Sequence, residues 1–331
     1  MTTNETTNET TTGTAAQDPS RKTSRHRAAD GAPEPALAAT VVVPTTGDRG
    51  PLLAHSIGSV LQQTVSNLEV FVIGDGITRE TRDHVVALAA RDPRVRLFEF
   101  DKHGSRGEPN RHRVLTDHAR GRIVAYLCDR DLWLPDHIEQ LGRALTNADF
   151  AHTLRFRVGE DDRIELTHVA DLRTPAGRRP DRLGPGLVPL SFAGHTLEAY
   201  RRLPWGWRTT PPGRSTDRHM WEQFLAEPWV RVAASPIPTV LTFRRGSHPG
   251  WSTPRRLEIL EAWTARLALP GGPDDVRDQV LDALWSDWAA GRRTALVAAS
   301  RRPTARARAL SARARGLVRR VTRRLASHAG R

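Results

Sequence analysis

Two carboxylates, Asp129 and Asp131, follow a short apolar run at residues 123–127 and are well placed to do chemistry. The apolar run predicts a buried strand, and a helix is predicted to begin near Pro135. Open α/β sheets bind ligands at the carboxyl ends of their strands, which is where these acids stand. Carboxylates at positions i and i+2 can share a divalent cation and, through it, a diphosphate. The alternative is that both acids are solvated and only cap the next helix.

The chain around these acids alternates between strand and helix patterns, as an α/β fold requires. The spacing implies right-handed crossovers into a parallel sheet. The first half predicts strands at 40–44, 68–73, 95–100 and 123–127, with helices at 52–63, 78–91 and 109–119. The second half predicts a helix at 137–145, a hairpin formed by 150–158 and 163–169, a helix starting near Thr196, a helix at 215–226, a strand at 238–243, and helices at 253–268 and 273–290.

Composition favours one enzyme-sized domain with tails. The 331 residues are 38% hydrophobic and include nine Trp, which is enough for the core of a large α/β domain. No apolar run reaches the roughly 18 residues that a membrane span needs, and the polar N-terminus does not read as a signal peptide. The single cysteine, Cys128, excludes an internal disulfide and a multi-cysteine metal site, which fits a reducing compartment.

The chain divides into a domain and three appended segments. We expect residues 1–38 to be a disordered N-terminal tail, because a Thr/Asn/Glu repeat followed by Pro, Ala and charged residues buries little apolar surface. The remaining segments are a domain at 39–245 with a nucleotide half (39–145) and an acceptor half (146–245), a helical extension at 246–299, and an Arg-rich amphipathic tail at 300–331.

The positive charge of the chain belongs to the tail. Thirteen arginines follow the last acid, Asp287, and they account for the whole formal net charge of +13. On a helical projection the apolar residues of the tail form one stripe, with the arginines of residues 313–324 outside it: Leu310, Ala314, Leu317, Val318, Val321 and Leu325. Such a helix favours an anionic membrane surface. Nucleic acid is the competing anion, and a solvated tail is the plain alternative.

Five short motifs follow one another along the first part of the chain: Val-Val-Val-Pro-Thr-Thr (41–46), Ser-Val-Leu-Gln-Gln-Thr (59–64), Gly-Asp-Gly (74–76), Asn-Arg-His (110–112) and Leu-Cys-Asp-Arg-Asp-Leu-Trp-Leu-Pro (127–135). In this order and at this spacing they resemble the motifs of the family 2 glycosyltransferases. The resemblance covers about 39–245 and is strong as far as residue 145. It implies an α/β fold of the GT-A type, a Rossmann-like nucleotide-diphospho-sugar transferase in a single domain, here with a helical C-terminal extension.

The resemblance implies a donor site in the first half. Pro44 and Thr45 would border the nucleotide base, Asp75 would bond the base or ribose, and Arg111 would contact the nucleotide. The alternatives are that Asp75 only forms a turn between two glycines and that Arg111 lies on a helix surface.

The acid cluster departs from the family pattern. When the flanking Leu and Trp are aligned, Cys128 and Arg130 stand at the two usual Asp-x-Asp positions. One interpretation keeps a divalent cation, Mn²⁺ or Mg²⁺, on Asp129 and Asp131 in a shifted register. A second gives the charge of the donor diphosphate to the guanidinium of Arg130, with a weak or absent metal. A third is that catalysis has been lost.

The resemblance also implies a catalytic base in the second half. Inverting transfer needs a carboxylate that deprotonates the acceptor hydroxyl, opposite the leaving nucleoside diphosphate. Asp217, in Ser-Thr-Asp-Arg-His-Met-Trp (215–221), matches that acid, and the alternative is a helix cap. His195, Trp205 and Trp207 are weaker acceptor candidates, whose alternative is packing in the core.

These features together predict an inverting glycosyltransferase. It would move a sugar from a nucleotide-diphosphate donor to a cell-envelope or secreted-glycan acceptor, which could be lipid-linked. We expect a role in polysaccharide biosynthesis in the bacterial cytoplasm, peripherally attached to the inner face of the plasma membrane. The alternatives are a non-catalytic GT-A-like protein that binds nucleotides or glycans, and a nucleic-acid-associated protein that acts through its tail.

Overall fold

The computed structural model describes residues 37–154, 156–159, 162–166, 171–174, 188–243 and 251–301. Residues 1–36 of the N-terminal segment expected to be disordered, and the apolar stripe expected in the Arg-rich tail, lie outside these residues.

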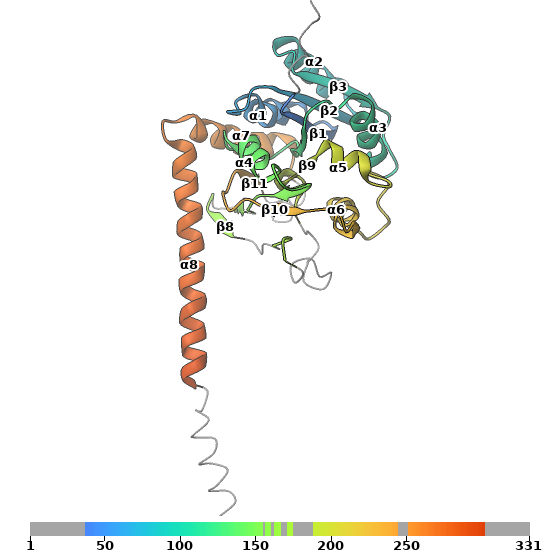
Figure 1. Ribbon diagram of the computed structural model, residues 1–331. Coiled ribbons are helices and arrows are strands. Elements are labelled where there is room, and N and C mark those ends of the chain that lie inside the picture. Colours follow the sequence, from blue (N-terminus) through green and yellow to red (C-terminus); the bar gives the residue numbers. More distant parts are fainter. Residues whose placement is uncertain are drawn as a thin grey trace, which may run out of the picture. The chain divides into compact units, whose positions relative to one another are not determined.

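A seven-stranded mixed sheet is the centre of the fold (Figure 1). Its strand order is β10-β6-β9-β4-β1-β2-β3. The strands are β1 (Ala39–Gly47), β2 (Leu68–Ile77), β3 (Val95–Phe100), β4 (Ile123–Tyr126), β6 (Phe150–His152), β9 (Ala193–Thr196) and β10 (Val232–Ala234). The first four strands are parallel to one another, as the sequence predicts, so the segments that follow β1, β2 and β4 emerge at one edge of the sheet.

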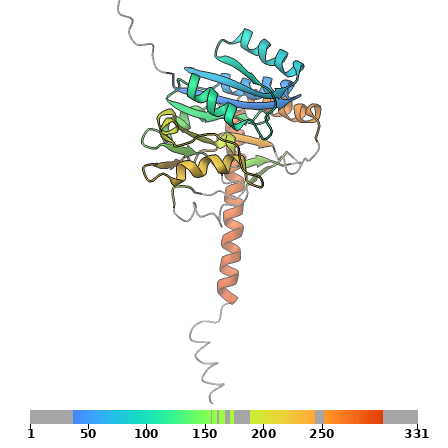
Figure 2. The same ribbon diagram turned by 90° about the vertical axis from the view of Figure 1, so that its right-hand side faces the viewer.

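Buried strands and crossover helices account for this arrangement. Residues Val41, Val42 and Val43 of β1 are fully buried, as a parallel strand covered on both faces requires. The crossovers are α1 (Gly50–Leu61), α2 (Arg79–Arg91) and α3 (Glu108–His118). Because β2 and β3 lie on one side of β1 and β4 on the other, right-handed crossovers put α1 and α2 on one face and α3 on the opposite face (Figure 2).

Two strands of the sheet, β9 and β10, have no counterpart among the predicted elements. β9 runs antiparallel between β4 and β6, so the sheet is mixed rather than purely parallel. Its last residue, Thr196, caps the helix α5 (Leu197–Arg202), because its hydroxyl accepts a hydrogen bond from the amide of Ala199 at 3.1 Å. The predicted helix start was therefore correct, and the four residues before it were missed.

The hairpin predicted over 150–158 and 163–169 was wrong in its first strand. After β6 the amide of Thr153 donates to the carbonyl of Phe192, and the chain then leaves the large sheet. The hairpin forms later, between β7 (Phe156–Val158) and β8 (Ile164–Leu166), in a second sheet. That sheet has the order β5-β11-β7-β8, with β5 (Leu132–Trp133) and β11 (Val240–Phe243) as its other strands.

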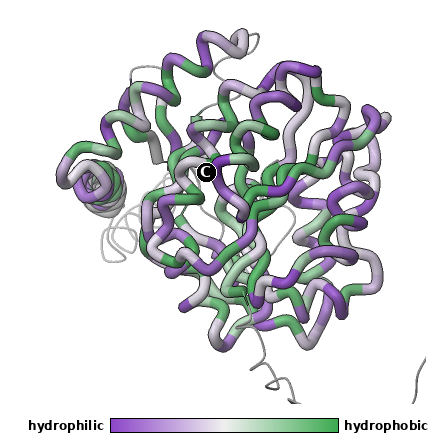
Figure 3. Tube along the Cα trace, turned by 90° about the horizontal axis from the view of Figure 1, so that it is seen from above, coloured by the Kyte–Doolittle hydropathy of each residue, from purple (hydrophilic) through white to green (hydrophobic). Residues whose placement is uncertain are grey.

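The described residues also contain four further α-helices. They are α4 (His137–Ala144), α6 (Thr216–Ala226), α7 (Thr253–Ala268) and α8 (Gly272–Arg301). α7 packs against α1 and buries Leu260 and Trp263, while α8 begins with the buried residues Val276 and Val280. Hydrophobic residues concentrate along the central strands (Figure 3). In the part of the chain that the structure describes, no helix combines the length and apolarity needed to cross a bilayer.

An aromatic cluster with a histidine joins the end of β4 to residues 195–207. The Tyr126 hydroxyl and His195 Nε2 are 2.7 Å apart, and the Trp207 indole donates to the same hydroxyl at 3.0 Å. His195 is fully buried, and burial lowers its pKa to about 4. Burial also lowers the pKa of His137, which stacks on Trp133, to about 3. Both rings are therefore neutral in the folded protein at physiological pH.

These neutral histidines predict a loss of stability in mild acid. Their pKa values in the folded protein lie below the unfolded value of about 6.5. Between pH 6.5 and about 4 the unfolded state therefore binds more protons than the folded state, and the free energy of unfolding decreases as the pH is lowered. Urea unfolding should show this decline in the wild type. His195→Gln should make it shallower, by at most about 1.4 kcal/mol per pH unit, the share of one proton. Identical pH slopes for the two proteins would contradict the assignment.

Candidate active site

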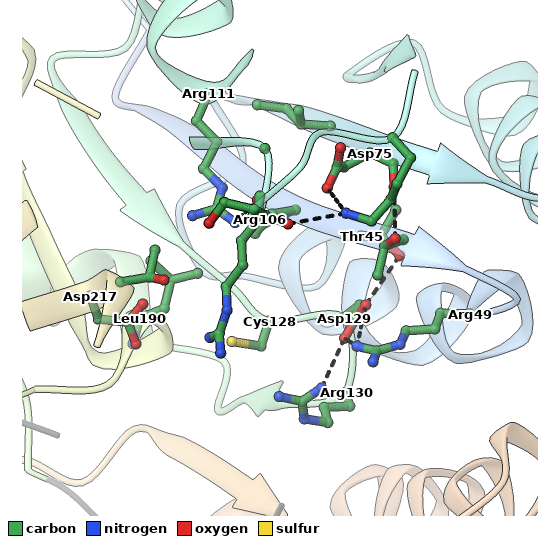
Figure 4. A pocket seen from close by; sticks show the side chains of 17 residues that line it. Thr45, Arg49, Asp75, Arg106, Arg111, Cys128, Asp129, Arg130, Leu190 and Asp217 are labelled. Carbon is green, nitrogen blue, oxygen red and sulfur yellow. Dashed lines mark hydrogen bonds and ion pairs between the residues drawn. The ribbon is translucent and has the colours of Figure 1, made fainter. Parts of the chain in front are cut away.

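One pocket collects the residues that the sequence singles out from both halves (Figure 4). Its walls come from the ends of β1, β2 and β4, the loop before α3, and the start of α6. Pro44 and Thr45 line it at the end of β1, as expected for residues that border a nucleotide. The predicted donor half and the predicted base therefore face the same cavity.

The segment after β1 is bound to the acid cluster. Arg49 Nη1 donates to both carboxylate oxygens of Asp129 at 3.1 Å, and the Thr45 hydroxyl donates to Oδ2 at 3.1 Å. Arg49 stands at the N-cap of α1, and the Thr81 hydroxyl of α2 fixes this turn by donating to the Gly47 carbonyl at 2.8 Å. The hydrogen bond to the Gly47 carbonyl therefore fixes the backbone of the turn, and the turn positions Arg49 against Asp129.

Asp75 holds the loop that leads into α3. Its carboxylate accepts from the His103 amide at 2.6 Å and from Lys102 Nζ at 2.5 Å. Gly107 has φ of 68°, and a Cβ there would lie 3.0 Å from the Cβ and Cγ of Asp75. The close approach and the left-handed backbone both call for glycine. Asp75 therefore does more than form a turn between glycines, because it organises one wall of the pocket.

Arg111 is buried rather than exposed on the surface of α3. Its Nη2 donates to the Arg106 carbonyl at 2.9 Å, and its guanidinium lies 4.9 Å from the ring centroid of Trp207. Burial lowers its pKa, although the carboxylate of Asp217 opposes the shift. Its Nε has no hydrogen-bond partner among the described residues. The surface alternative was wrong, and Arg111 presents a desolvated cation to the pocket.

Glu108 connects the two halves of the site. Glu108 is fully buried in the first turn of α3. Its carboxylate accepts hydrogen bonds from the Arg106 amide at 3.0 Å and from the Ser105 hydroxyl at 3.3 Å. The same carboxylate accepts from the Thr210 amide at 3.3 Å. It therefore fixes the backbone that carries Arg106 relative to the acceptor half.

The two acids after β4 point to different places. Asp129 lines the pocket, whereas Asp131 is buried outside its lining and accepts from the Ser191 hydroxyl at 2.5 Å. Burial raises the pKa of Asp131 to about 6. Burial also raises the pKa of the Cys128 thiol, which stays protonated in the pocket wall. Across the described residues, no three His, Cys, Asp or Glu side chains converge as metal ligands.

Arg130 completes the cationic lining of the pocket. Its Nη1 lies 3.6 Å from Asp129 Oδ1, and its side chain is only 15% exposed. Burial opposes its charge, but the Asp129 carboxylate keeps the pKa of the guanidinium above its usual value. Arg130 therefore enters the pocket as a permanent cation.

Asp217 faces the pocket from the first turn of α6 (Figure 4). The N-cap of this helix is Ser215, and the Asp217 carboxylate accepts a hydrogen bond from the Leu190 amide at 3.1 Å, outside its own helix. Burial raises the pKa of Asp217, against the opposing charge of Arg111. Asp217 is therefore not a simple helix cap.

The weaker acceptor candidates separate into buried and exposed residues. His195 is fully buried and Trp207 is 2% exposed, so neither offers a surface to an acceptor. Both residues are therefore packed in the core, which was the alternative to an acceptor role. The Trp207 ring also packs against the guanidinium of Arg111. Trp205 is 63% exposed beside a shallow pocket lined partly by α6. It remains available to stack against a sugar.

Sequence reasoning missed several residues that line the pocket, among them the following four: Arg49, Lys102, Arg106 and Leu190. Arg49 could have been found, because it is the basic residue of the loop that follows the predicted strand at 40–44, and such loops lie at the carboxyl edge of a parallel sheet. The other three sit in segments without a recognisable motif, and the fold brings them to the pocket.

A family comparison covers the part of the chain that forms this pocket. Residues 40–203 match the model described as glycosyl transferase family 2. An uncharacterised glycosyltransferase of Nostoc sp. is 28% identical over 117 residues, which are 34% of this chain and 35% of that protein. The Escherichia coli UDP-Glc:alpha-D-GlcNAc-diphosphoundecaprenol beta-1,3-glucosyltransferase WfgD is 34% identical over 98 residues, 29% of this chain and 36% of that protein. The matches thus span about a third of these two relatives.

Solved structures give lower identities. The mannosyltransferase PcManGT of Pyrobaculum calidifontis, in complex with GDP-Man and Mn²⁺, is 19% identical with a TM-score of 0.46, and the match covers 87% of this chain and 83% of that one. TarS residues 1–349 of Staphylococcus aureus are 13% identical with a TM-score of 0.49, over 76% of this chain and 72% of that one.

The order of the parallel strands, the pocket at their carboxyl ends and the match of residues 40–203 agree. Through these residues, the chain belongs to glycosyl transferase family 2.

Proposed function

We propose that this protein is an inverting glycosyltransferase that takes a sugar from a nucleotide-diphosphate donor. The observation that carries the proposal is the convergence of Asp217, from the acceptor half, with the cationic lining of the donor half in one pocket. A protein that only bound nucleotides would not need a desolvated carboxylate opposite the phosphate-binding side.

Asp217 is the proposed base. The acceptor hydroxyl oxygen attacks the anomeric carbon, and its proton passes to the Asp217 carboxylate. The bond from the anomeric carbon to the phosphate oxygen breaks, and its electron pair leaves with the nucleoside diphosphate. Burial favours the protonated form of Asp217, so it takes up the proton more readily than a solvated aspartate.

The donor would lie along the carboxyl ends of β1 and β2. Asp75 is 6% exposed at the pocket wall and can accept from the base or ribose, with Thr45 and Pro44 beside the same ligand. Arg111, held by Trp207, offers donors toward the nucleotide. This agrees with the general rule that open α/β sheets bind nucleotides at this edge.

The proposed acceptor is a glycan of the cell envelope or a secreted glycan, in polysaccharide biosynthesis. Support comes from the similarity to WfgD, whose name describes transfer to a sugar on a diphosphate lipid. Trp205, exposed beside α6, offers a face on which an acceptor sugar could stack.

An anionic membrane surface is a proposed partner of the C-terminal helix. α8 exposes Leu281, Leu284, Trp285 and Trp288, whose spacing puts them on one side of the helix. The two indoles lie 4.9 Å apart, and Arg292 lies 5.2 Å from the ring centroid of Trp288. Since no acid follows Asp287 in the sequence, the helix leads into a purely basic segment that complements anionic lipid. We propose peripheral attachment to the cytoplasmic face of a bacterial membrane.

Replacing the proposed base should stop turnover. Asp217→Asn should lower kcat by roughly 10²–10⁴-fold, because the amide cannot accept the acceptor proton, and nucleotide affinity should change little. Glu222→Gln, on the same helix but ion-paired with Arg214 and Arg218, is the matched control and should stay active. Product release would be followed with a panel of nucleotide sugars, and NMR of the product would report its anomeric configuration. Full activity of Asp217→Asn would exclude this residue as the base.

The pH profile tests the same residue independently. A base must be deprotonated, and burial raises the pKa of Asp217, so kcat/KM should rise with pH through a value above the ~4 of an ordinary aspartate. An acid limb at or below pH 4 would contradict the assignment.

Removing the Asp75 carboxylate should weaken donor binding. Asp75→Ala should reduce nucleoside diphosphate affinity by about 10-fold or more, the effect of losing a hydrogen bond to a charged group. Asp83→Ala, on the exposed side of α2, is the control and should bind normally. Calorimetry with UDP and GDP measures both, and an unchanged affinity would remove Asp75 from the donor site.

Membrane attachment should depend on the exposed indoles. The double change Trp285→Ala and Trp288→Ala should reduce binding to phosphatidylglycerol vesicles at least 10-fold in flotation assays, whereas Trp205→Ala, an exposed indole elsewhere, should not. Deletion of residues 302–331 should also reduce binding to these vesicles, and the binding that remains should be insensitive to salt. A concentration-dependent dimer that the double change abolishes, without vesicle binding by the wild type, would assign this face to a second copy instead.

A further inference from the structure

The acid cluster of the donor pocket does not fit a divalent cation. The family resemblance implies a cation between a carboxylate of this cluster and the donor diphosphate. Asp129 is the carboxylate of the cluster that lines the pocket, and Arg49 and Thr45 occupy both of its oxygens. A cation there would have to displace a two-oxygen contact with a guanidinium.

The second acid of the cluster cannot supply the missing ligand. Asp131 bonds the Ser191 hydroxyl and lies outside the pocket lining, so its carboxylate and that of Asp129 do not share a site. The residue between them, Arg130, brings a positive charge to 3.6 Å from the Asp129 carboxylate. Like charges repel strongly at this range when they are partly desolvated. The site therefore repels the ion that a shifted register would require.

The charge of the pocket suits a diphosphate without a metal. Five cationic side chains line it, Arg49, Lys102, Arg106, Arg111 and Arg130, against the three carboxylates of Asp75, Asp129 and Asp217. The excess of two positive charges matches a nucleotide-sugar diphosphate, in which each phosphate carries about one negative charge. Lys102 and Arg49 are already paired with Asp75 and Asp129, so the remaining arginines carry the excess.

We propose, on the basis of the glycosyl transfer proposed above, that this protein binds the donor diphosphate without a divalent cation and that the guanidiniums of Arg130 and Arg106 replace the metal. Arg130 stands where the family usually has a metal-binding acid, and both side chains extend into the pocket (Figure 4). Guanidinium forks donate paired hydrogen bonds to phosphate oxygens, which a lysine or a hydrated cation cannot do in the same geometry.

The charges also balance during transfer. When the bond from the anomeric carbon to the phosphate oxygen breaks, the leaving nucleoside diphosphate gains one negative charge. The acceptor proton moves to Asp217 in the same step and removes one carboxylate charge from the pocket. The excess positive charge of the lining thus rises as the leaving group becomes more negative, and no ion has to enter or leave.

The test is calorimetry of UDP and GDP with the full-length protein, in EDTA and then in Mn²⁺. The better-binding nucleotide should have the same Kd in both conditions within about threefold, because the diphosphate contacts are guanidiniums. Arg130→Ala should weaken binding at least 10-fold in EDTA, and Arg130→Lys should recover only part of the loss. Arg79→Ala, which removes an exposed arginine of α2, is the control for overall charge and should bind like the wild type.

Arg130→Asp restores the family's acid and sharpens the comparison. This variant should bind the nucleotide poorly in EDTA and at least 10-fold better in Mn²⁺, because the carboxylate removes the repulsion and supplies a ligand. Circular dichroism checks the fold of each variant, and the wild-type comparison stands without any of them. Wild-type binding that is at least 10-fold tighter in Mn²⁺ than in EDTA would overturn the inference while leaving glycosyl transfer intact. Failure of both nucleotides to bind under either condition would overturn the proposed function itself.

Discussion

The contact between Arg49 and the Asp129 carboxylate is the interaction on which the pocket depends. It joins the turn after β1 to the end of β4, two neighbouring strands whose carboxyl ends form the floor of the site. By neutralising Asp129 it leaves Arg130 with its charge largely available for a ligand. The same contact makes a structural anchor of Asp129, the carboxylate that a metal in a shifted register would need. Both the positive balance of the pocket and its misfit to a cation follow from this pair.

The remainder of the site is built around that floor by a few buried polar groups. Asp75 holds the loop at 102–107, and Glu108 fixes that loop to Thr210 of the acceptor half. The Trp207 indole donates a hydrogen bond to the Tyr126 hydroxyl at the end of β4, and its ring packs against the guanidinium of Arg111. Buried groups of this kind are costly when unpaired, so each contact strongly favours a single geometry. The donor and acceptor halves are therefore oriented by hydrogen bonds as well as by the hydrophobic core.

The sequence predicted the nucleotide half well because its elements depend on local signals. The valines of β1, the Thr78 cap of α2 and the proline at the start of α3 each define an element within a few residues. β9 and the split between β6 and β7 were missed because their pairing is set by partners far away, Ile123–Ala125 and Phe192. Similarly, a sequence can show that Asp129 and Asp131 are near neighbours. It cannot show that Ser191, sixty positions later, takes one of them out of the pocket.

We propose that this glycosyltransferase fold binds its donor diphosphate with arginines in place of a metal. A crystal structure of the protein with UDP or GDP, grown in Mn²⁺ and measured at the manganese absorption edge, tests it most directly. We expect paired hydrogen bonds from Arg130 to the diphosphate and no anomalous peak beside Asp129. A manganese peak bridging Asp129 and the phosphates, with Arg49 displaced from the carboxylate, would contradict it.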